Sequence, residues 1–251
     1  MKDYKFKFIG MISVCMTTYN GEKYLKQQIE SILYQLQEGD ELIISDDGST
    51  DNTINIIESF QSDKIILLNH KSEGRIYKNF ENSIINSKNE FILLSDQDDI
   101  WLENKLSYFK NALFDYDLVI SNCSIINESN NIILPYFYTK YSTFQKSFLG
   151  NLYKNSYLGC CMGFRRNILN IILPFPRGIA NHDWWIGLIC KFSKKKILYI
   201  DKPLLLYRKH NNNNSCTHEE SKYSLYQKLL WRIIIIIQIL KRRLLCMKMK
   251  F

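Results

Sequence analysis

The sequence predicts an α/β fold in which a mainly parallel sheet is flanked by helices. Short apolar runs of strand length alternate with longer segments whose apolar residues recur at the helical period. Polar loops follow three of these runs, which is where ligand-binding loops lie in such sheets. The 251 residues suit one larger domain, or one domain with a tail.

The first hundred residues give the clearest order of elements. We expect, in turn, a strand at 11–16, a helix at 22–37, a strand at 41–45, a helix ending at 60, a strand at 64–69, a helix at 76–87 and a strand at 91–95. Leu25, Ile29 and Ile32 fall on one face of the first helix. Ser49 or Thr50 is expected to cap the second helix.

Beyond residue 105 the alternation is weaker. Strands are predicted at 117–121, 159–164 and 197–200, and a helix is predicted at 186–192. Residues 122–158, which are rich in Asn and Tyr, are expected to form loops and irregular structure. The fold is therefore better specified in the first half of the chain than in the second.

The net charge of +8 is concentrated at the C-terminus. Residues 221–251 contain eight Lys or Arg residues and no Asp or Glu, so the rest of the chain is balanced. A balanced body argues against a nucleic-acid-binding face. We therefore predict a domain over residues 1–220 and a basic amphipathic helix within 221–251. The apolar run of this tail is too short to span a bilayer, so we expect it to bind a membrane surface or to pack on protein.

The seven cysteines show no CxxC spacing, which favours reduced and buried thiols. The N-terminal residues predict a strand rather than a signal peptide. We therefore predict a cytoplasmic protein, held peripherally at the inner face of the cytoplasmic membrane by residues 221–251.

The loop SDQDD at 95–99 places carboxylates directly after the apolar run FILL. Asp96 and Asp98 form a DxD arrangement, and close carboxylates repel one another unless a cation lies between them. A few oxygen ligands suit Mg²⁺ or Mn²⁺. The alternative is a solvated acidic turn.

Three further segments carry side chains suited to chemistry. Asp47, in the loop DDGS, can accept a hydrogen bond from a base or a ribose, or can simply form a turn. Asp183 lies beside two tryptophans, which favours a raised pKa and a general base, although a helix cap is the alternative. The tryptophans themselves can form a platform for a sugar ring. Arg208 and His210 face the same side if their segment is extended, where they suit a diphosphate and a metal, whereas an isolated surface histidine is the alternative.

Together these motifs resemble the family 2 inverting glycosyltransferases of the GT-A fold, most closely a bacterial rhamnosyltransferase-like branch. The motifs that carry the resemblance occur in the family's order over residues 12–214: SVCMTTYNGEKYLKQQIESILYQ, DDGSTDNT, EGRIYKNFENSI, LLSDQDDIW, HDWW and LYRKHNNN. The chain is short after residue 214, so we expect the acceptor-side elements of longer members to be reduced.

The resemblance implies roles for individual residues. Asp183 is the implied catalytic base, Asp99 shapes the DxD loop, and Gly74 lies near the donor. The implied donor-binding residues are Thr17, Tyr19, Asp47, Asn79, Asp96 and Arg208, and the implied ligands of Mg²⁺ or Mn²⁺ are Asp96, Asp98 and His210.

The resemblance implies an inverting transferase. It would move a sugar from dTDP-rhamnose, or from another nucleotide sugar such as a UDP-hexose, onto a hydroxyl of a cell-surface glycan or lipid-linked acceptor. The alternative is a non-catalytic nucleotide-sugar-binding or scaffold protein of a polysaccharide assembly complex. A phosphatase of the haloacid-dehalogenase type is disfavoured, because its aspartate motif belongs on the first strand.

Overall fold

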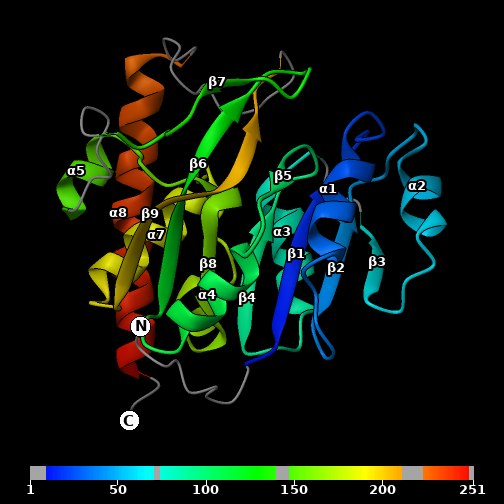
Figure 1. The fold of residues 1–251 in the computed structure, drawn as a ribbon. Coiled ribbons are helices and arrows are strands. Elements are labelled where there is room, and N and C mark those ends of the chain that lie inside the picture. The colour runs from blue at the N-terminus through cyan, green and yellow to red at the C-terminus, as the bar shows by residue number, and fades with distance from the viewer. Residues whose placement is uncertain (1–9, 71–73, 140–146, 211–222, 249–251) are drawn as a thin grey trace, which may run out of the picture.

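The computed structural model describes residues 10–70, 74–139, 147–210 and 223–248. Figure 1 shows one twisted sheet with helices on both faces. The strands are β1 (Ile12–Thr18), β2 (Glu41–Asp46), β3 (Ile65–Asn69), β4 (Phe91–Ser95), β5 (Ile100–Trp101), β6 (Leu118–Ile126), β7 (Ile132–Leu134), β8 (Met162–Arg165) and β9 (Ile197–Arg208). The helices are α1 (Leu25–Leu33), α2 (Thr53–Ser59), α3 (Ile76–Ile85), α4 (Lys105–Leu113), α5 (Phe148–Tyr153), α6 (Leu169–Ile172), α7 (His182–Phe192) and α8 (Leu225–Lys248).

The strand order is β3-β2-β1-β4-β8-β6-β9-β5, with β7 paired to β6. The first four of these strands are parallel to one another, and β8 is antiparallel to both of its neighbours. Every residue of β1, β2 and β4 is buried, as expected for a sheet covered on both faces. The predicted α/β class is therefore confirmed, with a mixed sheet whose N-terminal half is parallel.

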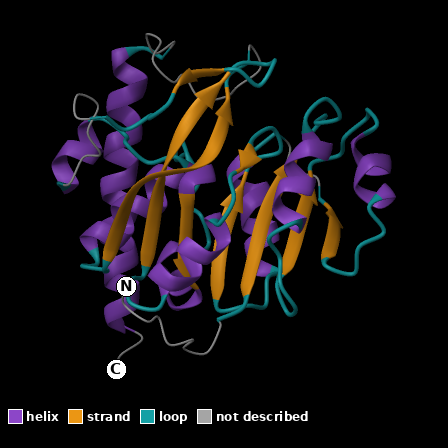
Figure 2. Cartoon of the chain, viewed as in Figure 1, coloured by secondary structure: helices purple, strands orange, loops and turns teal. Residues whose placement is uncertain are grey.

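Helices α1 and α4 cover one face of the sheet, and α3 and α7 cover the other (Figure 2). The Lys110 ammonium of α4 forms a 2.9 Å ion pair with Asp40, just after α1. On the opposite face, the Phe80 ring of α3 lies 4.2 Å from the His182 ring of α7, centroid to centroid. The strand ends that carry the predicted loops lie between these two layers.

The prediction of loops over residues 122–158 is wrong in part. Strand β6 continues to Ile126 and is followed by β7 and α5. Buried polar side chains interrupt the apolar pattern of β6, and two of them, Asn122 and Ser124, are hydrogen-bonded to the segment that follows the strand. The Asn122 amide donates to the Tyr138 carbonyl over 2.9 Å, and the Ser124 hydroxyl donates to the Pro135 carbonyl over 2.7 Å.

Helix α4 was not predicted, because two lysines occupy its buried face. Lys105 is fully buried and donates to the Cys160 carbonyl over 2.7 Å. Lys110 is 7% exposed and pairs with Asp40. Lysine is rarely buried unless it is paired, so the sequence pattern indicates a solvent-facing segment here.

The expected cap of α2 by Ser49 or Thr50 is also wrong. The helix begins at Thr53, and Asn52 precedes it without a side-chain capping bond. The Ser49 hydroxyl instead donates to the Asp46 carboxylate over 2.6 Å. Ser49 therefore ties its loop to the end of β2.

Helix α8 packs beside α7 along one side of the molecule (Figure 1). Ile235 and Ile239 are buried in the same core cluster as the sheet, and the Arg232 guanidinium donates to the Leu152 carbonyl over 3.0 Å. The predicted domain boundary at residue 220 stays a prediction. Among the described helices, none is long and apolar enough to cross a membrane.

Candidate active site

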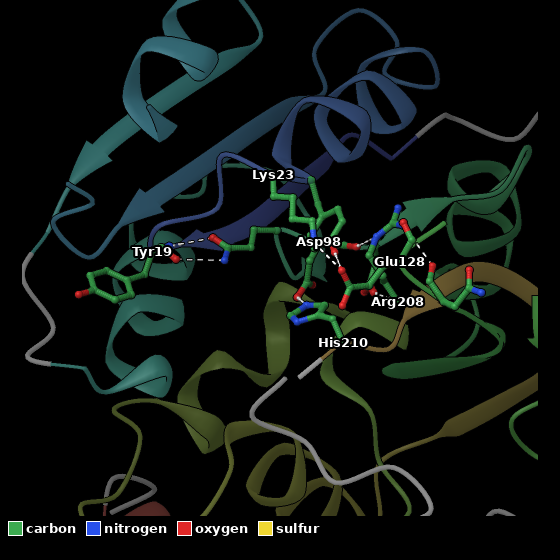
Figure 3. Close-up of polar contacts among 10 residues, drawn as sticks. Tyr19, Lys23, Asp98, Glu128, Arg208 and His210 are labelled. Atoms are coloured by element: carbon green, nitrogen blue, oxygen red, sulfur yellow. Dashed lines mark hydrogen bonds and ion pairs between the residues drawn. The ribbon is translucent and has the colours of Figure 1, made fainter. Parts of the chain in front are cut away.

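Three loops at the carboxyl ends of β1, β2 and β4 hold one another in place. The Tyr19 N–H donates to the Gln97 side-chain oxygen over 2.8 Å, and the Gln97 amide donates back to the Tyr19 carbonyl over 3.1 Å (Figure 3). The Asn20 N–H donates to the Ser49 hydroxyl over 2.8 Å. The middle residue of the DxD motif, which sequence reasoning left without a role, therefore fastens the first loop to the third.

Three predicted nucleotide-binding residues, Thr17, Tyr19 and Asp47, lie at the ends of β1 and β2, and a fourth, Asn79, lies on α3. Thr17 is 9% exposed, whereas Tyr19 is open to solvent. The Asp47 carboxylate accepts a 3.2 Å hydrogen bond from the Gly74 N–H. Asn79 donates to the Ser45 carbonyl over 2.8 Å, and its side-chain oxygen has no hydrogen-bond partner among the described residues.

The carboxylates after β4 form a strongly perturbed cluster. Burial raises the pKa of Asp96 to about 7, with further contributions from the charges of Asp98 and Asp183. Burial, Asp98 and Asp96 raise the pKa of Asp99 well above its usual range. Burial is thus the main cause of both shifts, and repulsion between the neighbouring carboxylates, which the sequence indicates, adds to it.

These residues fit a divalent cation, although the converging set differs from the predicted one. The Asp98 carboxylate lies 2.8 Å from the His210 Nε2, which joins two predicted ligands. The third predicted ligand, Asp96, instead converges with Asp99 and Cys160, whose ligand atoms all lie within 4.8 Å of one another. One carboxylate oxygen of Asp99 is buried without a hydrogen-bond partner in the described part of the chain, so it is available as a ligand.

Arg208 is 1% exposed, and its guanidinium makes many contacts within the protein. It donates to the Asp98 carbonyl over 2.8 Å, to the Asn130 side chain over 2.6 Å and to the Gln27 side chain over 3.0 Å. It also stacks 4.5 Å above the Tyr24 ring (Figure 3). A contact with a diphosphate would require exchange of these bonds, so the geometry indicates that Arg208 positions the 96–99 loop.

Asp183 lies in the first turn of α7 and is 9% exposed. Burial raises its pKa to about 7, against hydrogen bonds from the backbone of Trp184 and Gly159 that favour the charged form. A group with this pKa is suited to accept a proton near neutral pH. Asp183 also contributes to the raised pKa of Asp96, so the two carboxylates lie within electrostatic reach of each other.

The two tryptophans after Asp183 belong to the core rather than to an open sugar platform. Trp185 is fully buried and Trp184 is 6% exposed. Their indole N–H groups donate to the Ile172 and Asn151 carbonyls over 2.8 and 2.7 Å. The role expected of them as a sugar platform is therefore wrong, because both indoles are buried in the core.

Two buried groups were missed by sequence reasoning. Burial lowers the pKa of His182 to about 3, so this neighbour of Asp183 is neutral, with its ring against Phe80. Burial also lowers the pKa of Lys105, whose ammonium lies near Asp99 and 4.3 Å from the centroid of the Trp101 ring. No local sequence signal marks either residue, because their environments come from distant elements.

The family model described as "Glycosyl transferase family 2" matches residues 13–173. A dTDP-rhamnosyl transferase, RfbG of Shigella flexneri, is 31% identical over 79% of this chain and 72% of its own. WfgD of Escherichia coli, a UDP-Glc:alpha-D-GlcNAc-diphosphoundecaprenol beta-1,3-glucosyltransferase, is 30% identical over 71% of this chain and 68% of its own.

A solved structure of residues 1–349 of TarS from S. aureus, in complex with UDP, has a similar fold. Its TM-score is 0.68 at 19% identity, and the match covers 92% of this chain and 65% of TarS 1–349. The same TarS fragment in complex with UDP-GlcNAc gives a TM-score of 0.67 at 20% identity, covering 90% of this chain and 66% of that one. The chain thus spans about two thirds of this structural neighbour.

Proposed function

Because this chain belongs to glycosyl transferase family 2, we propose that it is an inverting enzyme that transfers a sugar from a nucleotide donor to an acceptor hydroxyl. The observation that carries the proposal is the meeting of two carboxylate groups from distant parts of the chain. Asp96 follows β4 and Asp183 opens α7, and the charge of Asp183 raises the pKa of Asp96. On this proposal Asp183 is the general base, and its charge acts on the acidic loop that we assign to the donor.

The donor we propose is dTDP-rhamnose, with a UDP-hexose as the second choice. RfbG, which is named for dTDP-rhamnose, matches more of this chain than WfgD, which is named for UDP-Glc. Thr17, Tyr19, Asp47 and Asn79 would hold the nucleoside, because the first three lie at the ends of β1 and β2 and Asn79 of α3 donates to the Ser45 carbonyl of β2. The Asn79 side-chain oxygen, which has no hydrogen-bond partner among the residues that the structure describes, would supply a buried acceptor there.

Asp183 would remove the proton of the acceptor hydroxyl as that oxygen attacks the anomeric carbon. The bond from this carbon to the diphosphate breaks in the same displacement, so the configuration inverts and no covalent sugar–enzyme intermediate forms. The proton ends on the Asp183 carboxylate, whose raised pKa suits that state. Trp184 and Trp185 exclude water that would compete with the acceptor.

We propose Mg²⁺ or Mn²⁺ as the cofactor. Asp98 with His210, and Asp96 with Asp99, are the groups that would hold it. When bound, the cation would stabilise negative charge on the leaving diphosphate. Arg208 supports this site from behind, because it fixes the Asp98 carbonyl and the Asp99 side chain.

The acceptor we propose is a hydroxyl of a cell-surface or lipid-linked glycan, and we place the protein peripherally on the inner face of the cytoplasmic membrane.

On α8, Ile233 and Ile237 are 45% and 44% exposed. Replacing both with Gln should reduce co-sedimentation with phosphatidylglycerol vesicles, because less apolar surface is available to the lipid. Ile85→Gln on α3, where the side chain is 63% exposed, is the matched control. Equal pelleting of all three proteins would argue against membrane binding.

The variant Asp183→Asn tests the proposed reaction. We expect sugar transfer to fall by about 100-fold or more, since general bases contribute roughly that much, while binding of dTDP or UDP is retained. The exposed Asp115→Asn serves as the control and should transfer normally. Near wild-type transfer by Asp183→Asn would contradict the base assignment. A wild-type protein that binds these nucleotides but transfers from no donor would favour the scaffold alternative.

A further inference from the structure

An open pocket of about 460 Å³ lies between the start of α3 and the segment that precedes α7, and it has no role in the mechanism above. Its lining residues are Arg75, Tyr77, Arg177, Gly178 and Ile179. We call it the arginine pocket. Its walls come from segments about a hundred residues apart in the chain, so only the fold creates it.

The two walls of the arginine pocket lead to opposite sides of the site. Arg75 directly precedes α3 and follows Gly74, whose N–H donates to the predicted nucleotide-binding Asp47. Arg177 and Ile179 belong to the segment that runs into α7, which carries Asp183. The pocket therefore lies where a molecule that approaches Asp183 meets the donor side of the site.

No described residue pairs with the charges of the arginine pocket. Neither the Arg75 nor the Arg177 guanidinium makes a hydrogen bond or an ion pair with any residue that the structure describes. Arg208, by contrast, is saturated with protein acceptors. Two guanidinium groups beside one cavity suit a phosphate or diphosphate, because each can donate two parallel hydrogen bonds to its oxygens.

We propose that the arginine pocket binds the phosphate or diphosphate group of a phosphate-bearing acceptor, an inference that rests on the proposed function. Ile179 and Asp183 are four residues apart, so their Cα atoms are separated by at most about 14 Å. A phosphate in the pocket thus lies close to the hydroxyl that Asp183 would deprotonate. The acceptor is accordingly a short one, in which few sugars separate the phosphate from the reacting hydroxyl.

The acceptor, rather than the donor, is the source of this phosphate on two grounds. The donor diphosphate is already assigned to the loop at 96–99, which lies on a different element from either arginine. In addition, a side chain at Gly178 would lie 3.5 Å from Ile234 of α8. The pocket is thus next to α8, on which Ile233 and Ile237 are exposed. A lipid attached to the phosphate could contact this apolar surface.

The test compares ligands on the full-length protein by isothermal titration calorimetry. Farnesyl diphosphate is titrated in the presence of EDTA, which removes the cation that the acidic loop would need, and inorganic pyrophosphate is titrated likewise. Separate titrations use dTDP or UDP with Mn²⁺. The variants are Arg75→Gln, Arg177→Gln and the double substitution, with the exposed Lys191→Gln as a control for lost charge.

We expect the double variant to bind farnesyl diphosphate at least 10-fold more weakly than the wild type, with unchanged dTDP or UDP affinity and a normal Lys191→Gln control. Stronger binding of farnesyl diphosphate than of pyrophosphate would identify a lipid-linked source, and equal binding a free phosphate group. An unchanged affinity for farnesyl diphosphate, or an equal loss for the nucleotides, would overturn the proposal. Either of these two outcomes would leave the proposed function intact. The proposed function fails instead if the wild type binds no nucleotide.

Discussion

Replacing Asp183 with Asn should stabilise the folded protein, by an amount that grows with pH. Asp183 is 9% exposed, and burial raises its pKa from 3.8 to about 7 in spite of the backbone hydrogen bond from Trp184. This rise corresponds to about 4 kcal/mol, since one pKa unit is worth about 1.4 kcal/mol. The folded chain pays that amount to carry the charge that catalysis would use.

The stabilisation by Asp183→Asn grows with pH because the carboxyl group ionises at different pH values in the folded and unfolded states. Below pH 3.8 the carboxyl group is protonated in the folded and unfolded states alike, so burial of the charge costs nothing. As the pH rises towards about 7, the unfolded chain ionises first, and the free energy of unfolding falls by about 1.4 kcal/mol per pH unit. Above about pH 7 both states are ionised and the whole penalty remains. An Asn side chain carries no charge and avoids this penalty. The gain in the free energy of unfolding is reduced by about 1 kcal/mol, because Asn accepts a weaker hydrogen bond from Trp184.

Urea denaturation from pH 5 to pH 8 in EDTA measures the difference between variant and wild type. The chelator keeps cations away from Asp96, whose own pKa should fall once the charge at position 183 is gone. Asp117→Asn is a control of opposite sign. Burial acts to raise the pKa of Asp117, but hydrogen bonds from Lys196 and Asn167 hold it below its usual value, so that variant should lose stability above about pH 4. A pH-independent difference for Asp183→Asn would refute the reasoning.

Three further predictions concern the site and its support. Arg208→Met should lower the free energy of unfolding by about 3 kcal/mol in urea titrations, because the Asp98 carbonyl and the side chains of Gln27 and Asn130 lose their hydrogen-bond donor. A loss below about 1 kcal/mol would show that these hydrogen bonds of Arg208 contribute little to stability. His210→Ala should weaken Mn²⁺ binding, measured calorimetrically, by about 10-fold, since it removes a group 2.8 Å from Asp98; unchanged affinity would exclude His210 from the metal site. Gly187→Ala should lower the melting temperature even though alanine favours helices. The new methyl group would lie 2.3 Å from the Tyr157 ring, and overpacking of this kind costs about 1–3 kcal/mol. An unchanged or raised melting temperature would show that the ring moves freely.

The parallel half of the fold and the positions of its loops were determined by the sequence alone. Strands β1, β2 and β4 are built around short apolar runs, and each is followed by a polar loop that the sheet brings to the same edge. This information is local, because the period of the side chains and the residues that end each run lie within one short segment. The raised pKa of Asp183 was predictable for the same reason, since two tryptophans follow it directly.

Only the tertiary structure decided which polar groups meet. Asp98 pairs with His210 across 112 positions of the chain, and Gln27 accepts from Arg208 across 181. The burial of Lys105 and the convergence of Asp96, Asp99 and Cys160 are likewise invisible along the chain. The physical reason is that a charge or a hydrogen-bonding group is defined by its nearest partners and by its distance from water. The periodicity of the sequence indicates whether a side chain faces the core, but it does not identify the groups that the side chain contacts in the core.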